Sequence, residues 1–172
     1  MKLKKILPFE YFVLQTKLTR AEVLGRIADN IEPRKGLRLD SYPENRIKQY
    51  EGRIIDNNFE INRIINYKNS FLPMISGQVE PGTNNMKIFI TMRPAIFVMV
   101  LMSIVLGTTG SACLIIIIMV IINFNKILQQ GISPMILIPF GMFILGYGMV
   151  IIGFKTESKK AKGFLIDLLE AY

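Results

Sequence analysis

The sequence AIFVMVLMSIVLGTTGSACLIIIIMVIINF, residues 95–124, decides the fold of this chain because it contains no charged side chain. A second uncharged stretch, MILIPFGMFILGYGMVIIGF, follows at residues 135–154. A helix needs about 20 apolar residues to cross roughly 30 Å of hydrocarbon, and each stretch supplies them. A chain of 172 residues leaves too little material to wrap two such helices in a soluble core. The sequence therefore predicts an integral membrane protein with two spans.

The residues around the spans predict their orientation. The linker at residues 123–133 contains one charged side chain, Lys126, and its shortness predicts a tight antiparallel hairpin. Most nearby cations lie on the outer flanks instead, and cytoplasmic flanks are enriched in Lys and Arg. We therefore expect both termini in the cytoplasm. The flanking cations are Lys87 and Arg93 before the first span, and Lys155, Lys159, Lys160 and Lys162 after the second.

Small residues recur within both spans. In the first span they follow one another at four-residue spacing, which places them on one helix face, and such faces let helices approach closely in lipid. We expect them either to pack the hairpin or to form a self-association face. Neither span contains Asp, Glu, Lys, Arg or His, which argues against coupled transport. The expected helix-packing residues are Ser103, Gly107 and Ser111, with Gly110 nearby, and Gly141, Gly146, Gly148 and Gly153.

The residues before the first span have the patterns of a small α+β domain. Residues 6–16 predict a strand, and Thr19 with Glu22 predicts a capping box for a helix that ends at Pro33. Alternating apolar residues then predict two hairpins, which form a meander of about four strands. We expect a small antiparallel sheet with one helix. The strand predicted from FLPMISGQV, residues 71–79, contains Pro73 and is expected at an edge or a bulge, because proline cannot donate a hydrogen bond to a neighbouring strand.

The residues after the second span predict an amphipathic helix. Its apolar stripe includes Leu165 and Leu169, and its polar face carries Asp167 and Glu170. A helix that lies on a membrane surface normally has a basic polar face, so we expect this one to pack on the sheet. The expected domains are a cytoplasmic α+β domain (1–93), a transmembrane helical hairpin (94–154) and a cytoplasmic tail helix (155–172).

The sequence offers few groups for catalysis. It contains no His and a single Cys, Cys113, which lies within the first span. The commonest general base is therefore missing, as are the ligands of a cysteine zinc site. Phosphate-binding glycine loops, nucleophile elbows and kinase motifs are also missing. We expect no enzymatic activity, no cofactor and no metal site.

The chain is basic, with 21 Lys and Arg against 13 Asp and Glu. Anionic lipid headgroups would attract such a domain beside the membrane. A nucleotide-like anionic ligand could instead use the cations of the glycine-containing loop at residues 34–46. Nucleic acid is not expected, because no aromatic–basic RNA motif is present. The candidate anion or lipid contacts are Arg34, Lys35, Arg38, Arg46, Lys48, Arg93, Lys155, Lys159 and Lys160.

Three motifs carry a resemblance to known proteins: YKNSFLPMISGQV at 67–79, KIFITMRP at 87–94 and GFKTESKKAKGFL at 153–165. Together they resemble uncharacterised small bacterial two-span membrane proteins. The resemblance implies a bacterial inner membrane and supplies no catalytic residue. The order of a small sheet, a hairpin and a terminal helix is also similar to bacterial pleckstrin-homology-like membrane domains.

These observations lead to one hypothesis and two alternatives. The hypothesis is a non-enzymatic, two-pass inner-membrane protein whose basic cytoplasmic domain binds a protein partner or an anionic lipid surface. The first alternative is a ligand-sensing membrane effector whose spans form a homo-oligomeric pore, and the stripe at Ser103, Gly107 and Ser111 motivates it. The second alternative is an accessory subunit of a larger membrane complex.

Overall fold

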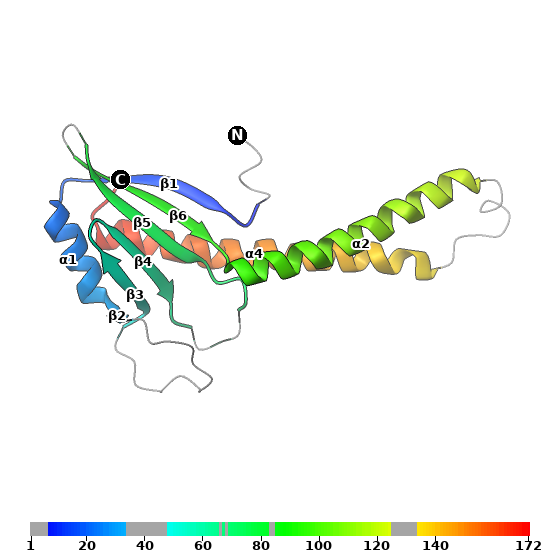
Figure 1. The fold of residues 1–172 in the computed structure, drawn as a ribbon, viewed down its shortest axis with the longest axis horizontal. Coiled ribbons are helices and arrows are strands. Elements are labelled where there is room, and N and C mark those ends of the chain that lie inside the picture. The colour runs from blue at the N-terminus through cyan, green and yellow to red at the C-terminus, as the bar shows by residue number, and fades with distance from the viewer. Residues whose placement is uncertain (1–6, 34–47, 66, 68, 83–84, 125–133) are drawn as a thin grey trace. The chain divides into compact units, whose positions relative to one another are not determined.

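The computed structural model describes residues 7–33, 48–65, 67, 69–82, 85–124 and 134–172. The chain divides into two compact units (Figure 1). We call Met1–Ala95 together with Gly153–Tyr172 the sheet unit, and Ile96–Ile152 the apolar unit. The sheet unit is therefore discontinuous in sequence. The expected linker at residues 123–133, with Lys126, lies outside the described residues from position 125 onward.

The sheet unit contains a six-stranded sheet in the order β1-β6-β5-β4-β3-β2. All neighbouring strands are antiparallel except β2 and β3, which are parallel. The α+β prediction is confirmed, but the purely antiparallel meander is wrong, because the residues expected to end the first helix continue as β2. The strands are β1 (Glu10–Thr16), β2 (Ile31–Pro33), β3 (Tyr50–Ile55), β4 (Asn58–Arg63), β5 (Met74–Pro81) and β6 (Met86–Arg93).

Alternation along the strands gives the sheet one buried face. Ile88, Ile90 and Met92 of β6 are fully buried, as the period-two pattern predicts. The expectation for Pro73 is wrong, because β5 lies between β4 and β6 in the middle of the sheet. Pro73 comes one residue before β5 begins at Met74, so its missing N–H removes no hydrogen bond from the ladder.

Helix α1 (Arg20–Asn30) begins as the sequence predicts. Its N-cap Thr19 accepts a hydrogen bond from the backbone N–H of Glu22 at 3.3 Å, and the Glu22 carboxylate accepts one from the backbone N–H of Thr19 at 2.7 Å. This reciprocal pair satisfies two N–H groups that a helix start leaves without partners. Helix α1 then buries Val23 and Ile27.

Helix α4 (Ile138–Leu168) differs from the prediction of a separate span and tail helix. It follows a short 3-10 helix (Pro134–Leu137), and it continues from the apolar residues into the polar ones without a break. Residues 155–162, KTESKKAK, contain neither glycine nor proline, so nothing there ends the helix. It ends before Glu170, whose φ of 48° lies in the left-handed region.

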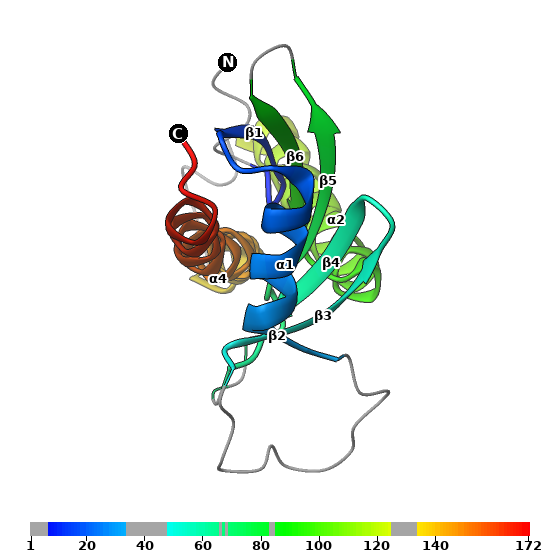
Figure 2. The same ribbon diagram turned by 90° about the vertical axis from the view of Figure 1, so that its left-hand side faces the viewer.

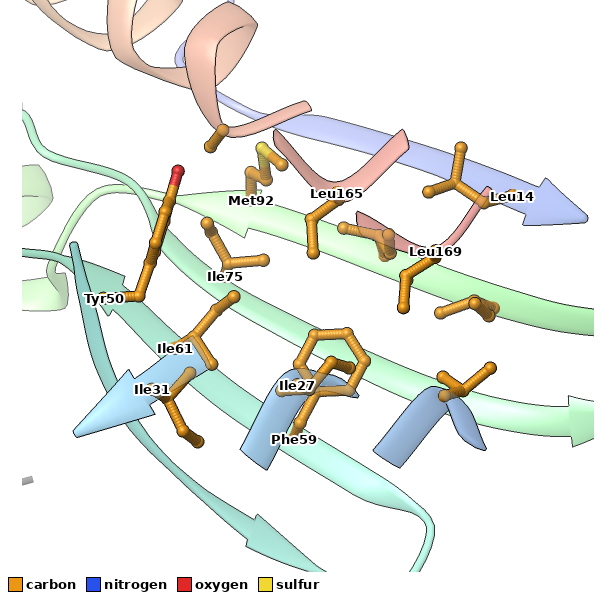
Figure 3. Close-up of a cluster of buried hydrophobic side chains, with 14 of the residues drawn as sticks. Leu14, Ile27, Ile31, Tyr50, Phe59, Ile61, Ile75, Met92, Leu165 and Leu169 are labelled. Atoms are coloured by element: carbon orange, nitrogen blue, oxygen red, sulfur yellow. The ribbon is translucent and has the colours of Figure 1, made fainter. Parts of the chain in front are cut away.

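Helix α1 and the second part of α4 pack against the sheet (Figure 2). Figure 3 shows Ile27 of α1 and Leu165 of α4 in one cluster with strand side chains. We call this the covered face of the sheet, and the opposite face the open face. Burial of one leucine contributes about 2 kcal/mol. Helix α4 adds Phe154, Ala161 and Leu165 to this core, and Leu169, directly after the helix, adds a fourth buried side chain.

The apolar unit contains α2 (Ile96–Ile122) and the first part of α4. By length and composition, these two helices are able to cross a membrane. At 1.5 Å per residue, α2 is about 40 Å long. A Cβ built on Gly110 would lie 3.3 Å from the Phe143 ring, and one on Gly146 would lie 3.6 Å from Leu106. The two helices therefore pack where these two glycines lie.

Candidate functional site

The sheet unit has one edge at which the chain leaves for the apolar unit and returns from it. Strand β6 ends at Arg93, three residues before α2 begins at Ile96. The returning helix lies close by, because Lys155 Nζ donates to Glu10 Oε1 at 2.8 Å and Glu10 pairs with Met92 of β6. We call this region the exit edge: residues 7–10 and 92–95 and the first turns of the returning segment, 153–160.

A buried carboxylate joins α4 to strand β4 beside this edge. The Glu157 side chain is only 2% exposed, and its oxygens accept hydrogen bonds from the Arg63 guanidinium and the Tyr67 hydroxyl. Lys160 Nζ donates a third, at 2.9 Å. We call these four residues the Glu157 cluster. A buried charge is tolerated only when it is paired and hydrogen-bonded, and the cluster meets both conditions.

The cluster holds its groups in fixed protonation states. Burial disfavours the ionised form of Glu157, but hydrogen bonds from Tyr67, Lys160 and Arg63 outweigh it, so the pKa of this carboxyl lies below its ordinary value. The hydrogen bond to the carboxylate raises the pKa of Tyr67 and that of Lys160. At neutral pH, Glu157 is therefore ionised and the other groups keep their protons. Because none of these groups changes its protonation state near neutral pH, the cluster is better suited to attaching α4 to β4 than to transferring protons.

The segment after β4 also contacts α4 at the exit edge. Asn69 Nδ2 donates to the Gly153 carbonyl at 3.2 Å, and the backbone N–H of Phe71 donates to Asn69 Oδ1 at 3.0 Å. A Cβ built on Gly153 would lie 3.0 Å from the Phe71 ring. The absence of a side chain at position 153 thus allows this close approach. The first residue of the returning segment is therefore held by the loop that precedes β5.

The predicted anion or lipid contacts fall into three groups. Arg34, Lys35, Arg38 and Arg46 lie outside the described residues. Lys48 lies elsewhere in the sheet unit, where Nζ donates to the carbonyls of Ile31 at 3.0 Å and Ala28 at 3.4 Å, next to the end of α1. The remaining four belong to the segments of the exit edge: Arg93 ends β6, and Lys155, Lys159 and Lys160 lie in the returning segment of α4.

The predicted helix-packing residues lie mostly on open helix faces. The Ser103 and Ser111 hydroxyls donate to the carbonyls of Met99 and Gly107, each at 2.8 Å. A Cβ built on Gly107, Gly141 or Gly148 would meet nothing within 4 Å in this chain. The residues at which the two helices approach each other are Gly146, which is one of the expected packing residues, and Gly110, which lies near the predicted stripe of α2.

Sequence reasoning missed the Glu157 cluster, although one signal was available. Phe59, Ile61 and Arg63 share the covered face of β4, because alternate residues of a strand point the same way. An arginine on a face that is otherwise apolar requires a buried acceptor. The acceptor, Glu157, is 94 positions away in the sequence.

The open face of the sheet contains a hollow that the sequence did not predict. Its volume is about 580 Å³, within the range of small-ligand and peptide sites. Arg53 of β3 and Glu60 of β4 both line it and form an ion pair at 2.7 Å between these neighbouring strands. The other side chains that line the hollow from the open face are one carboxylate, Glu80, one aliphatic residue, Ile55, and a majority of aromatic or neutral polar residues, namely Tyr11, Phe89, Asn58, Ser76, Gln78 and Thr91.

Comparison with known proteins identifies no relative of this chain: no family model, curated protein or solved structure matches it. Among the described residues, no group of three or more His, Cys, Asp or Glu lies close enough together to hold a metal ion. The exit edge, the Glu157 cluster and the open face are therefore the features from which a function is inferred.

Proposed function

We propose that this chain is a non-enzymatic, two-pass protein of the bacterial inner membrane with both termini in the cytoplasm. In this proposal the sheet unit is a binding module that presents its open face to a protein partner. The observation that carries the proposal is the unequal use of the two sheet faces. Helices α1 and α4 cover one face, whereas the other carries a hollow of about 580 Å³.

The chemistry of the open face supports protein binding over catalysis. Tyr11 and Phe89 provide aromatic surface, and Ser76 and Gln78 provide neutral hydrogen-bonding groups. Aromatic side chains with dispersed polar groups are typical of protein interfaces. Among the lining residues, the Arg53 guanidinium and the Glu60 carboxylate form an ion pair with each other. The described lining offers no histidine or thiol as a base or nucleophile.

Site-specific photocrosslinking tests this proposal. A photoreactive phenylalanine analogue replaces Tyr11 or Phe89 on the open face of the full chain, and cells are irradiated. We expect a discrete protein adduct that disappears when Ser76→Trp fills the hollow. The matched control places the same analogue at Tyr172, which is 67% exposed but does not line the hollow. Adducts that persist in the Ser76→Trp background would reject the open face as the site.

A second candidate function is self-association of the apolar unit, as in the pore-forming effector. The face of α2 that carries Ser103, Gly107 and Ser111 is exposed, and Gly107 has open space beside it. Such a face accepts a second helix backbone. The Gly107→Leu variant should reduce the mass of the detergent-solubilised particle to that of a monomer, and Val105→Leu, on the opposite side of α2, serves as a control. A wild-type particle that is already monomeric in mild detergent excludes this function.

A further inference from the structure

We propose that the exit edge is a binding site for the headgroups of an anionic phospholipid bilayer. In this site Arg93 and Lys159 bind lipid phosphates, and Leu7 and Phe9 enter the interfacial layer beside them. The inference rests on the membrane placement of the apolar helices and is independent of any protein partner on the open face. It assigns a ligand class to one edge of the sheet unit.

Chain connectivity places both cations close to a bilayer surface. Arg93 is three residues from the start of α2, which is at most about 10 Å of extended chain. Lys159 is five residues beyond Phe154, the last residue of the uncharged stretch, which is roughly 8 Å along the helix axis. Both distances are comparable to the Debye length of roughly 8–10 Å at physiological salt. Surface charge on the lipid therefore acts on both side chains.

Exposed charges after Phe154 are sorted by distance from the apolar unit. The lysines occur within the first turns after Phe154, where the single acid, Glu157, is buried and paired, whereas the exposed Asp167 and Glu170 come later. At 1.5 Å per residue, Asp167 lies about 20 Å beyond Phe154. An anionic surface thus attracts the near end of the helix and is screened from the far end. This order is complementary to an anionic bilayer. The near lysines are Lys155, Lys159, Lys160 and Lys162.

Most cations near the exit edge already have partners in the sheet unit. Lys155 and Lys160 donate to Glu10 and Glu157, and Lys162 Nζ lies 4.7 Å from the centre of the Phe12 ring. Arg93 and Lys159 are exposed and, within the described part of the chain, neither contacts a carboxylate. These two cations are therefore able to bind phosphate without breaking an existing pair.

Two exposed apolar side chains precede β1 at the exit edge. Leu7 is 55% exposed and Phe9 is 44% exposed. Phe9 directly precedes Glu10, which pairs with Met92, so it continues the β1 strand direction beside Arg93. Exposed apolar residues beside Arg and Lys are typical of segments at the membrane interface, where one part is apolar and the other is hydrated.

The absence of tryptophan from the chain allows a direct test. The full-length Phe9→Trp variant is placed in lipid nanodiscs that contain acyl-brominated quenching lipid, with either zwitterionic headgroups alone or equal parts of zwitterionic and phosphatidylglycerol headgroups. We expect at least about twofold stronger quenching with the anionic lipid, because attraction draws the edge into the interface. The Ile55→Trp control is 52% exposed at the far end of β3 and should be quenched weakly in both.

Charge variants identify the cations responsible. In the Phe9→Trp background, the combination of Arg93→Gln and Lys159→Gln should reduce the fluorescence quenching in anionic nanodiscs to that seen in zwitterionic nanodiscs. Salt at about 0.5 M should have the same effect, because it screens the attraction. Lys17→Gln combined with Lys87→Gln removes the same charge at the opposite ends of β1 and β6, and it should leave the quenching unchanged.

Equal quenching in the two lipids, or equal loss in the two double variants, would overturn the proposal. The Leu7→Trp variant gives the same readout if Phe9→Trp does not fold. Nanodiscs expose both leaflets and contain no partner protein. The quenching therefore does not depend on which way the chain is oriented in a cell membrane, or on whether a partner binds the open face.

Discussion

The ring of Phe59 in β4 lies over the backbone of Gly77 in β5, in the space that a side chain at position 77 would fill. The two residues are directly paired across the strands, and Phe59 is 1% exposed. Because both lie on the covered face, the glycine lets one of the largest buried side chains of the sheet lie against the backbone of β5. Packing in the middle of the sheet therefore requires a residue without a side chain at position 77.

Replacement of Gly77 by alanine should lower stability. The new Cβ would overlap the Phe59 ring, and overpacking of this kind costs about 2 kcal/mol. Thermal unfolding of the full chain in detergent measures the loss. The control is Gly25→Ala in α1, where a Cβ meets nothing within 4 Å and the helix gains about 0.5–1 kcal/mol. Equal effects of the two substitutions would contradict this account of Gly77.

Removal of the Glu157 charge should also destabilise the sheet unit. The Glu157→Ala variant leaves the partly buried Arg63 without its carboxylate, which costs about 3 kcal/mol. Thermal unfolding again provides the measurement. As a control, Glu60→Ala breaks the exposed pair with Arg53 and should cost about 0.5 kcal/mol or less. If Arg63→Leu with Glu157→Leu is as unstable as Glu157→Ala, the unpaired charge is not the cause.

Stability should fall in acid partly through the same carboxyl. The pKa of Glu157 is lowered in the folded chain, so the folded state binds fewer protons than the unfolded state below about the ordinary value of 4.5. This contribution is complete above that ordinary pKa and is lost as the pH falls through the lower folded value. The midpoint of thermal unfolding between pH 7 and pH 3 should therefore drop less in Glu157→Gln than in the wild type. Glu22, whose pKa is also lowered, supplies a second part of the slope.

Truncation of the α4 core residues should loosen the strands as well as the helix. Leu165 and Leu169 are fully buried against side chains of the sheet, and Leu→Ala at such sites costs about 2–5 kcal/mol. Limited proteolysis of Leu165→Ala should release fragments from residues 1–95. Asp167→Ala, on the exposed side of the same helix, is the control. Strands that stay as protease-resistant as in the wild type would show that α4 is dispensable for their folding.

The features that the sequence predicts correctly depend on neighbours in the chain. Thr19 and Glu22 are three residues apart, so the capping box is a local pattern. The alternation of Ile88, Ile90 and Met92 is equally local and identifies the buried face of β6. Uncharged runs likewise predict helices α2 and α4 from length alone.

The features that the sequence did not predict depend on distant partners. Strand β2 has three residues and forms by pairing with β3, which begins at Tyr50. The Arg63–Glu157 pair joins positions 94 apart. Small residues occur on more than one face of α2, and rotation of the helix decides that Gly110, rather than Gly107, meets α4. The pattern alone contains no information on that rotation.

The discontinuity of the sheet unit sets an order of events during synthesis. Strands β1 to β6 are made before α2, but Phe154, Leu165 and Leu169 are made only after the whole apolar unit, Ile96–Ile152. The covered face of the sheet therefore has no complete apolar cover while the apolar unit is being synthesised. Synthesis of the entire apolar unit is thus a precondition for the final folding of a sheet that precedes it in the chain.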